Sequence, residues 1–128
     1  MTRESARKWY RQALHDLEMA EKNIEIGGYD VSAFLSHQCV EKLLKAGFIL
    51  EGMSVPKTHF VDELARRLNL PEQLQDEIID LTVDYTFSRY PDVSEKVPYE
   101  EYTEEIAKKK VEIAKEVLKY FKRRWGEL

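Results

Sequence analysis

Residues 30–51 carry apolar side chains around almost their whole circumference when they are placed on an α-helix of about 3.6 residues per turn. A helix that is apolar all round is buried inside a protein, so these residues predict a central helix with other helices around it. The exception is one narrow polar side, which is formed by Gln38, Glu41 and Lys45, with His37 and Lys42 beside it. This side either meets water, supported by a Glu41–Lys45 pair one turn apart, or lines a groove that recognises a ligand.

The rest of the chain also spaces its apolar residues by threes and fours, and no segment alternates apolar and polar residues as a strand would. This spacing predicts four more helices, over residues 5–26, 59–68, 71–90 and 100–125. The connections between them are short, which makes neighbouring helices antiparallel. We therefore expect one all-α domain over residues 1–128, folded as an up-and-down bundle of four to five helices.

Charge is unevenly distributed along the chain. The net charge of −4 argues against a protein that coats nucleic acid without specificity. Most cations lie near the two ends, at Arg3, Arg7, Lys8, Arg11, Lys108, Lys109, Lys110, Lys119, Lys122, Arg123 and Arg124. If the first and last helices are neighbours, these cations form one basic patch. The alternative is an ordinary solvated surface, with cations at a helix C-terminus where the helix dipole favours them.

Several kinds of site are excluded by residues that the sequence lacks. Cys39 is the single cysteine, so there is no disulfide framework and no cysteine metal site. His15, His37 and His59 do not have the spacing of metal ligands, and no glycine-rich phosphate loop is present. We expect no metal and no cofactor. There is also no signal peptide and no apolar run of about 18 residues, which predicts a cytoplasmic protein that makes no contact with membranes.

The stretch FSRYPDV, residues 87–93, places a cation where the pattern predicts a core-facing position. On a continuous helix Arg89 lies within about 40° of Tyr85, one turn earlier, and therefore points toward the core. The helix should end near Tyr90, because the residue before a proline avoids the helical conformation. A buried arginine needs an acceptor, since an unpaired buried charge is costly. Glu41, on the polar side of the central helix, is the predicted partner.

These residues together resemble the HEPN domain family over essentially the whole chain. The resemblance is carried, in order, by Ala13, Asp16, Leu17, Ala20, the Tyr29–Asp30 turn, His37–Gln38, Glu41–Lys42, Lys45–Ala46, His59 and Arg89–Tyr90. It implies a HEPN-like helical bundle that usually forms a homodimer. It also implies a minimal nucleotidyltransferase as partner, in a toxin–antitoxin-like pair, and binding of nucleotide or RNA in a groove.

Many HEPN proteins are metal-independent RNases, and the motif that the resemblance implies for them is an arginine followed after four to six residues by a histidine. Here the corresponding residues after Arg89 are Ser94, Glu95 and Lys96, and no other arginine has a histidine at that spacing. Cleavage of RNA through its 2′-hydroxyl benefits from a group that titrates near neutral pH, which histidine supplies. We therefore expect no RNase activity, with His37 or His59 acting as a non-standard base as the alternative.

The sequence thus leaves three functions open. The first is a non-enzymatic nucleotide-binding and partner-binding module, whose candidate groove residues are His37, Gln38, Glu41, Lys45, His59, Arg89, Tyr90 and Asp92. Tyr90 is also a candidate for modification, because in some pairs of this family the transferase adenylylates a tyrosine near the arginine. The second is an RNase toxin, and the third is a purely structural dimerisation module.

Overall fold

The computed structural model describes residues 2–87, 90–93 and 95–128, and for residues 86, 87 and 93 it describes the backbone alone. The elements are α1 (Arg3–Glu25), α2 (Tyr29–Leu50), α3 (Val61–Arg67), α4 (Glu72–Thr82), α5 (Asp84–Phe87), the 3-10 helix η1 (Pro91–Val93), α6 (Pro98–Glu101) and α7 (Glu104–Trp125). All regular structure in these residues is helical, so the predicted all-α class is confirmed.

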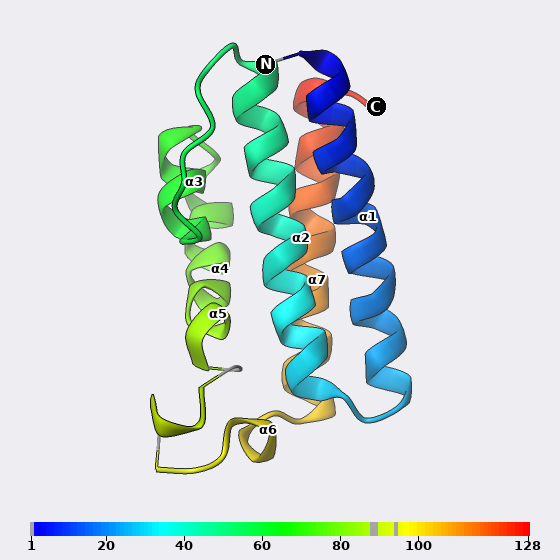
Figure 1. Cartoon of the computed structure of the whole chain (residues 1–128), viewed down its shortest axis with the longest axis vertical. Coiled ribbons are helices and arrows are strands. Elements are labelled where there is room, and N and C mark those ends of the chain that lie inside the picture. Colours follow the sequence, from blue (N-terminus) through cyan, green and yellow to red (C-terminus); the bar gives the residue numbers. More distant parts are fainter. Residues whose placement is uncertain (1, 88–89, 94) are drawn as a thin grey trace.

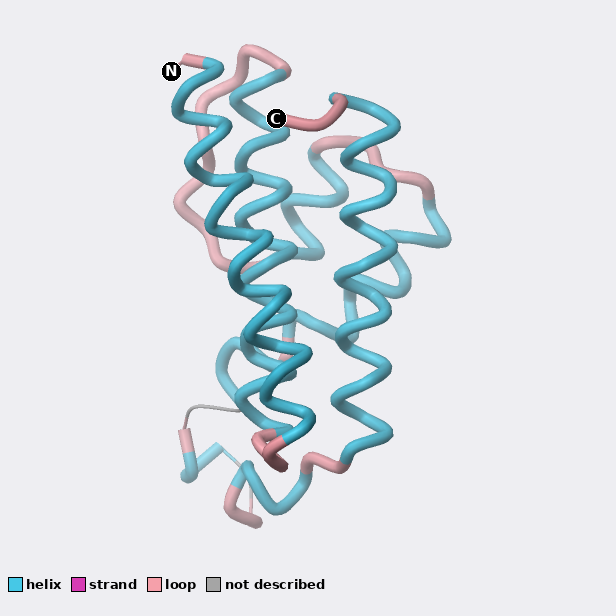
Figure 2. The backbone as a smooth tube through the Cα atoms, turned by 90° about the vertical axis from the view of Figure 1, so that its right-hand side faces the viewer, coloured by secondary structure: helices cyan, strands magenta, loops and turns pink. Residues whose placement is uncertain are grey.

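The long helices α1, α2 and α7 run the length of the molecule, and α3, α4 and α5 follow one another along the other side of α2 (Figure 1). The direction of the chain reverses from α1 to α2, again from α2 to the α3–α5 side, and once more into α7, which gives an up-and-down bundle. Both termini lie at the same end (Figures 1 and 2). No helix in the described residues is long and apolar enough to cross a membrane.

Helix α2 is the centre of the bundle, as its apolar surface predicts. It packs against α1, α7 and each of α3, α4 and α5. Phe48, Leu43, Leu44 and Val40 of α2 are almost completely buried. Packing is close near the end of α2, where a Cβ added to Gly47 would lie 2.6 Å from the Cη2 atom of the Trp125 indole. Glycine at this position therefore lets the last turn of α7 lie directly against α2.

Two of the expected helices are interrupted. The helix expected over residues 71–90 divides at Val83 into α4 and α5. Next to this break, the Thr82 hydroxyl donates to Oδ1 of Asp62 at 2.9 Å, which ties the end of α4 to α3. The helix expected from residue 100 starts instead at Glu104, because the Thr103 side chain accepts a hydrogen bond from the backbone N–H of Ile106 and caps α7.

Candidate functional site

A buried ion pair lies on the polar side of α2. Glu41 and Lys45 are one helical turn apart, and Nζ of Lys45 lies 2.9 Å from Oε2 of Glu41. The two residues are only 6% and 5% exposed. The polar side of α2 therefore does not simply meet water, because other residues cover its central pair.

His59 supplies part of this cover. It lies in the segment between α2 and α3, and its Nδ1–H donates to Oε2 of Glu41 at 2.9 Å. Its backbone carbonyl, 3.0 Å from Nε2 of His37, accepts a hydrogen bond from that ring. The His59 side chain remains 51% exposed. The two contacts with α2 thus hold a half-exposed imidazole in a defined orientation, with Nδ1 toward Glu41 and Nε2 on the other side of the ring.

The carboxylate of Glu41 is the group that joins these side chains. Burial by itself raises its pKa. The hydrogen bonds from Lys45 and His59 and their charges outweigh this effect, so the pKa lies below the usual value for glutamate. Glu41 is therefore ionised at neutral pH. Its second oxygen, Oε1, is buried and has no hydrogen-bond donor among the residues that the structure describes.

His37 has a different environment from His59. It is completely buried on α2. Burial lowers its pKa below the usual value for histidine, although the charge of Glu41 acts in the opposite direction. A neutral ring that donates from Nε2 to the His59 carbonyl fixes the segment that carries His59. His37 is thus a structural support, and His59 is the imidazole that solvent reaches.

Tyr85 of α5 completes the cluster. Its ring stacks on His59, with centroids 4.8 Å apart and planes 12° from parallel. The same ring lies 5.3 Å from His37 and 6.3 Å from Phe34, measured between centroids. The sequence placed Tyr85 on an apolar stripe and gave it no part in the site. Its position one helical turn before Arg89, a candidate groove residue, is the signal that could have assigned it to the site.

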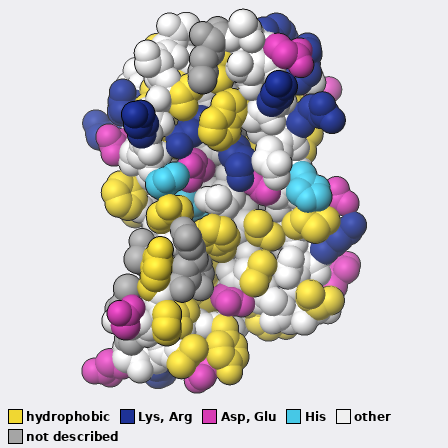
Figure 3. Space-filling view, viewed as in Figure 1, with side chains coloured by type: hydrophobic (Ala, Val, Ile, Leu, Met, Phe, Trp, Pro, Cys, Tyr) yellow, Lys and Arg dark blue, Asp and Glu magenta, His cyan; other side chains and the backbone are white. Residues whose placement is uncertain are grey.

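We call Glu41, Lys45, His37, His59 and Tyr85 the His59 cluster. Figure 3 shows histidine, acidic and basic side chains close together about midway along the face that it views. A second buried network supports the helix that carries Tyr85. There the Tyr102 hydroxyl donates to Oδ1 of Asp84, while Nζ of Lys110 lies 3.1 Å from Oδ2. Burial raises the pKa of Asp84 above its usual value, against the opposing effects of Tyr102 and Lys110.

Two contacts connect the cluster to α1. Nζ of Lys45 lies 5.8 Å from the centroid of the Trp9 ring. Lys42, next to Glu41 in sequence, donates to Oδ2 of the buried Asp16, whose Oδ1 accepts from the Gln12 amide at 3.1 Å. Asp16 belongs to the expected family pattern, but the sequence did not reveal that it pairs with Lys42.

The predicted groove residues fall into three groups. His37, Gln38, Glu41, Lys45 and His59 lie together, and Oε1 of Gln38 is 3.3 Å from Nδ1 of His37. Tyr90 is 46% exposed, and Asp92 is exposed in η1. Arg89 lies outside the described residues, so the Arg89–Glu41 pair stays a prediction.

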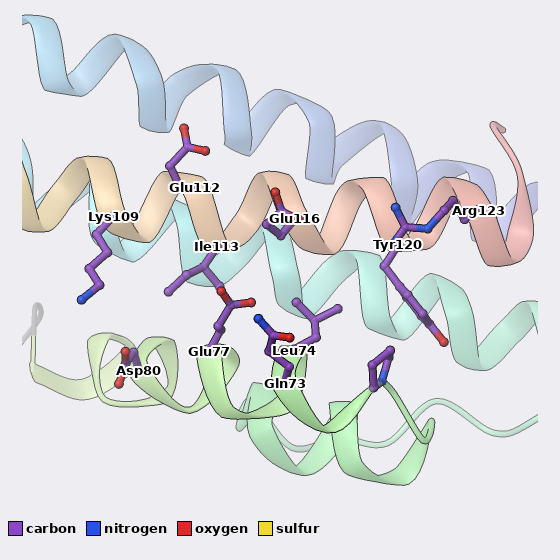
Figure 4. A pocket seen from close by; sticks show the side chains of 11 residues that line it. Gln73, Leu74, Glu77, Asp80, Lys109, Glu112, Ile113, Glu116, Tyr120 and Arg123 are labelled. Atoms are coloured by element: carbon purple, nitrogen blue, oxygen red, sulfur yellow. The ribbon is translucent and has the colours of Figure 1, made fainter.

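A separate surface cavity lies elsewhere on the bundle. It is a groove of about 560 Å³ between α4 and α7, into which Glu77 of α4 and Glu116 of α7 project (Figure 4). Four carboxylates, at Glu77, Asp80, Glu112 and Glu116, line it beside two cations, Lys109 and Arg123. An excess of carboxylates disfavours a phosphate ligand, and no residue of the His59 cluster lines this groove.

Comparison with known proteins decides the family. A model described as the HEPN domain matches residues 6–125. The chain belongs to the HEPN domain family. It is 30% identical over 131 residues to a Methanocaldococcus jannaschii protein named "Putative toxin MJ1304", and the match covers 91% of this chain and 86% of that protein. The resemblance seen in the sequence is thus confirmed at the level of the family.

Solved structures agree with this assignment. A crystal structure of ST0689, described as an archaeal HEPN homologue, is 35% identical with a TM-score of 0.82, and the match covers 93% of this chain and 96% of that one. The crystal structure of TT1696 from Thermus thermophilus is 28% identical with a TM-score of 0.87, and the match covers 92% of this chain and 96% of that one. The bundle of this HEPN domain is therefore similar to known structures over nearly its whole length.

The buried pair in this HEPN domain makes a prediction about stability. Glu41→Gln leaves the Lys45 ammonium buried without its carboxylate and should lower the free energy of unfolding by about 3–5 kcal/mol. The matched control is Glu18→Gln, which removes the carboxylate of the exposed Glu18–Lys22 pair on α1 and should have little effect. Urea denaturation followed by circular dichroism measures both variants. Equal losses of stability would show that the buried pair has no special role.

Proposed function

We propose that this HEPN protein is a nucleotide-binding and RNA-binding component of a toxin–antitoxin-like pair, and that it acts with a minimal nucleotidyltransferase. The observation that carries the proposal is the His59 ring, half exposed and stacked on Tyr85, above the buried pair of Glu41 and Lys45. An aromatic ring with a solvent-accessible edge and a fixed orientation is a suitable surface for a base.

The chemistry of the cluster favours a nucleotide over an apolar ligand. A flat base can stack on or beside the imidazole and phenol rings, which supply aromatic area at little cost in conformational entropy. The Nε2 atom of His59, on the ring edge away from Glu41, can exchange a hydrogen bond with a polar edge of the base. Arg89, if it lies near the cluster as the sequence predicts, would add a charge-assisted hydrogen bond to a phosphate.

The partner and the assembly are proposed from the family. The resemblance implies a homodimer and a minimal nucleotidyltransferase as partner, and the relative from Methanocaldococcus jannaschii bears the name "Putative toxin MJ1304". Such a pair would act in the cytoplasm. Tyr90, 46% exposed, is accessible enough to accept a nucleotidyl group from the partner.

Nucleotide binding can be tested with AMP and UMP. At 100 times its dissociation constant a bound nucleotide should add about 2.7 kcal/mol of stability, which thermal denaturation detects as a higher melting temperature. We expect His59→Ala and Tyr85→Leu to abolish the increase. Tyr99→Leu replaces a tyrosine that is 63% exposed and outside the His59 cluster, so it is the matched control and should retain the increase. An unchanged melting temperature with both nucleotides would contradict nucleotide binding and would favour a purely structural domain.

The partner can be tested by coexpression with a minimal nucleotidyltransferase encoded beside this chain. In the proposed reaction the Tyr90 oxygen attacks the α-phosphorus of ATP, the phenol loses its proton and pyrophosphate leaves. Mass spectrometry should then find one AMP group on Tyr90. The modification should disappear in Tyr90→Phe and remain in Tyr99→Phe, since Tyr99 is a second tyrosine that is 63% exposed. An unmodified Tyr90 beside an active transferase contradicts this part of the proposal.

A second function, metal-independent RNA cleavage, is favoured by one observation. The Nδ1–H of His59 donates to the ionised Glu41, which is the arrangement of a base and the carboxylate that orients it. Nε2 would then take the proton of a 2′-hydroxyl. The 2′-oxygen would attack the phosphorus as the bond to the 5′-oxygen breaks, and the 5′-oxygen would take a proton from water, giving a 2′,3′-cyclic phosphate. The absence of histidine at residues 94–96 still makes binding without cleavage our first choice.

Incubation of the purified protein with a labelled RNA separates these two functions. Binding without cleavage predicts intact RNA. If His59 is a catalytic base, cyclic phosphate ends appear, and they disappear in His59→Ala and in Arg89→Ala. Products that survive both substitutions come from a contaminating nuclease.

A further inference from the structure

We propose that the first half of α1 binds the phosphate backbone of a single-stranded nucleic acid, one base of which occupies the His59 cluster. The inference rests on the proposed function and extends it from a mononucleotide to a strand. It starts from a surface hollow of about 320 Å³ that is lined by Lys8, Arg11, Gln12 and His15. All four side chains are exposed.

The hollow differs from other charged parts of the surface because its lining includes no carboxylate. Neither Lys8 nor Arg11 forms an ion pair within the part of the chain that the structure describes. By contrast, Arg7 pairs with Glu4 at 2.8 Å, and Lys22 pairs with Glu18 at 2.9 Å. Cations without carboxylate partners have their full charge available for a phosphate, and each can release a condensed counterion when the strand binds.

The C-terminal cations, which the sequence grouped with those of α1, are less suitable. Lys119 pairs with Glu116, Lys122 with Glu127, and Arg124 with Glu51. Arg123 lines the groove that holds four carboxylates. The first and last helices do pack together, but the basic surface that remains is the α1 side of the predicted patch.

The hollow is connected to the His59 cluster by residues in contact. Trp9 follows Lys8 in the sequence, and the centroid of its ring lies 5.8 Å from Nζ of Lys45. Lys45 in turn pairs with Glu41. Gln12, in the hollow, donates to Asp16, and Asp16 accepts from Lys42 of α2. Figure 3 shows basic side chains over the upper part of α1 on the same face as the histidine, acidic and basic side chains midway along the molecule. A single strand can therefore follow one face from the hollow to the cluster.

The hollow is long enough along α1 for more than one phosphate contact. Lys8 and His15 are seven residues apart, which corresponds to about 10 Å along a helix axis. Lys8 and Arg11 then contribute two permanent charges, and Gln12 contributes an amide donor. These groups contact the strand backbone in the proposed arrangement, so the surface sets the position of the strand and the cluster holds the base.

In the test, a labelled oligouridine is titrated with the wild-type protein and with the Lys8→Gln/Arg11→Gln variant, and fluorescence anisotropy gives the affinity of each. Loss of two phosphate contacts should weaken binding about 25-fold at 0.1 M salt and reduce the slope of log K against log salt by about 1.4, at about 0.7 for each single-strand contact. The matched control, Lys108→Gln/Lys119→Gln, removes the same charge from exposed positions of α7 and should bind like wild type.

The same titration with a deoxythymidine oligonucleotide of equal length is the second part of the test. Weaker binding of DNA identifies RNA as the ligand, and equal binding of both identifies any single strand.

UMP distinguishes the failure of this inference from the failure of the proposed function. If wild type binds neither UMP nor the oligonucleotide, the proposed function fails. If the Lys8→Gln/Arg11→Gln variant binds UMP and also binds the oligonucleotide with unchanged affinity and salt slope, only the basic surface of α1 is ruled out. An equal loss in the α7 control overturns the inference as well, because net charge alone would explain it.

Discussion

The buried carboxylate of Glu41 is the group on which the arrangement of the site depends. A charge on a central helix loses its hydration, and this loss must be offset by charged and hydrogen-bonded partners. Lys45 supplies an ammonium one turn away, and His59 supplies an N–H from outside the helix. The second partner has the larger structural consequence, because it attaches the segment before α3 to α2 and presents an imidazole at the surface.

The same need of a buried carboxylate for polar partners explains why Tyr85 has a fixed position. Its helix, α5, has only four residues and is too short to be stable by itself. Asp84 anchors it through Tyr102 and Lys110, and the Tyr85 ring lies against His59 and His37. Two buried carboxylates on different helices thus hold the two aromatic rings of the cluster together. The apolar core gives the bundle its stability, and these polar contacts give the site its geometry.

The sequence predicted the bundle because helical periodicity extends through the whole chain, and it predicted the polar side of α2 because three polar residues interrupt an apolar surface. It did not predict that His59 donates to Glu41, since a residue in a connecting segment has no periodicity that shows where it points. The break at Val83 was missed for a related reason, because the Thr82–Asp62 contact joins residues 20 positions apart. Arg89 was assigned to Glu41 from helix geometry that assumed no such break.

The most direct test of this account is the side-chain nitrogen spectrum of His59, recorded by NMR with and without UMP. If Glu41 orients the ring for a nucleotide, Nδ1 carries the proton that is donated to Glu41, and the Nε2 resonance shifts when UMP is added. A proton on Nε2 in place of Nδ1, or a His59 spectrum that UMP leaves unaltered, would contradict the account.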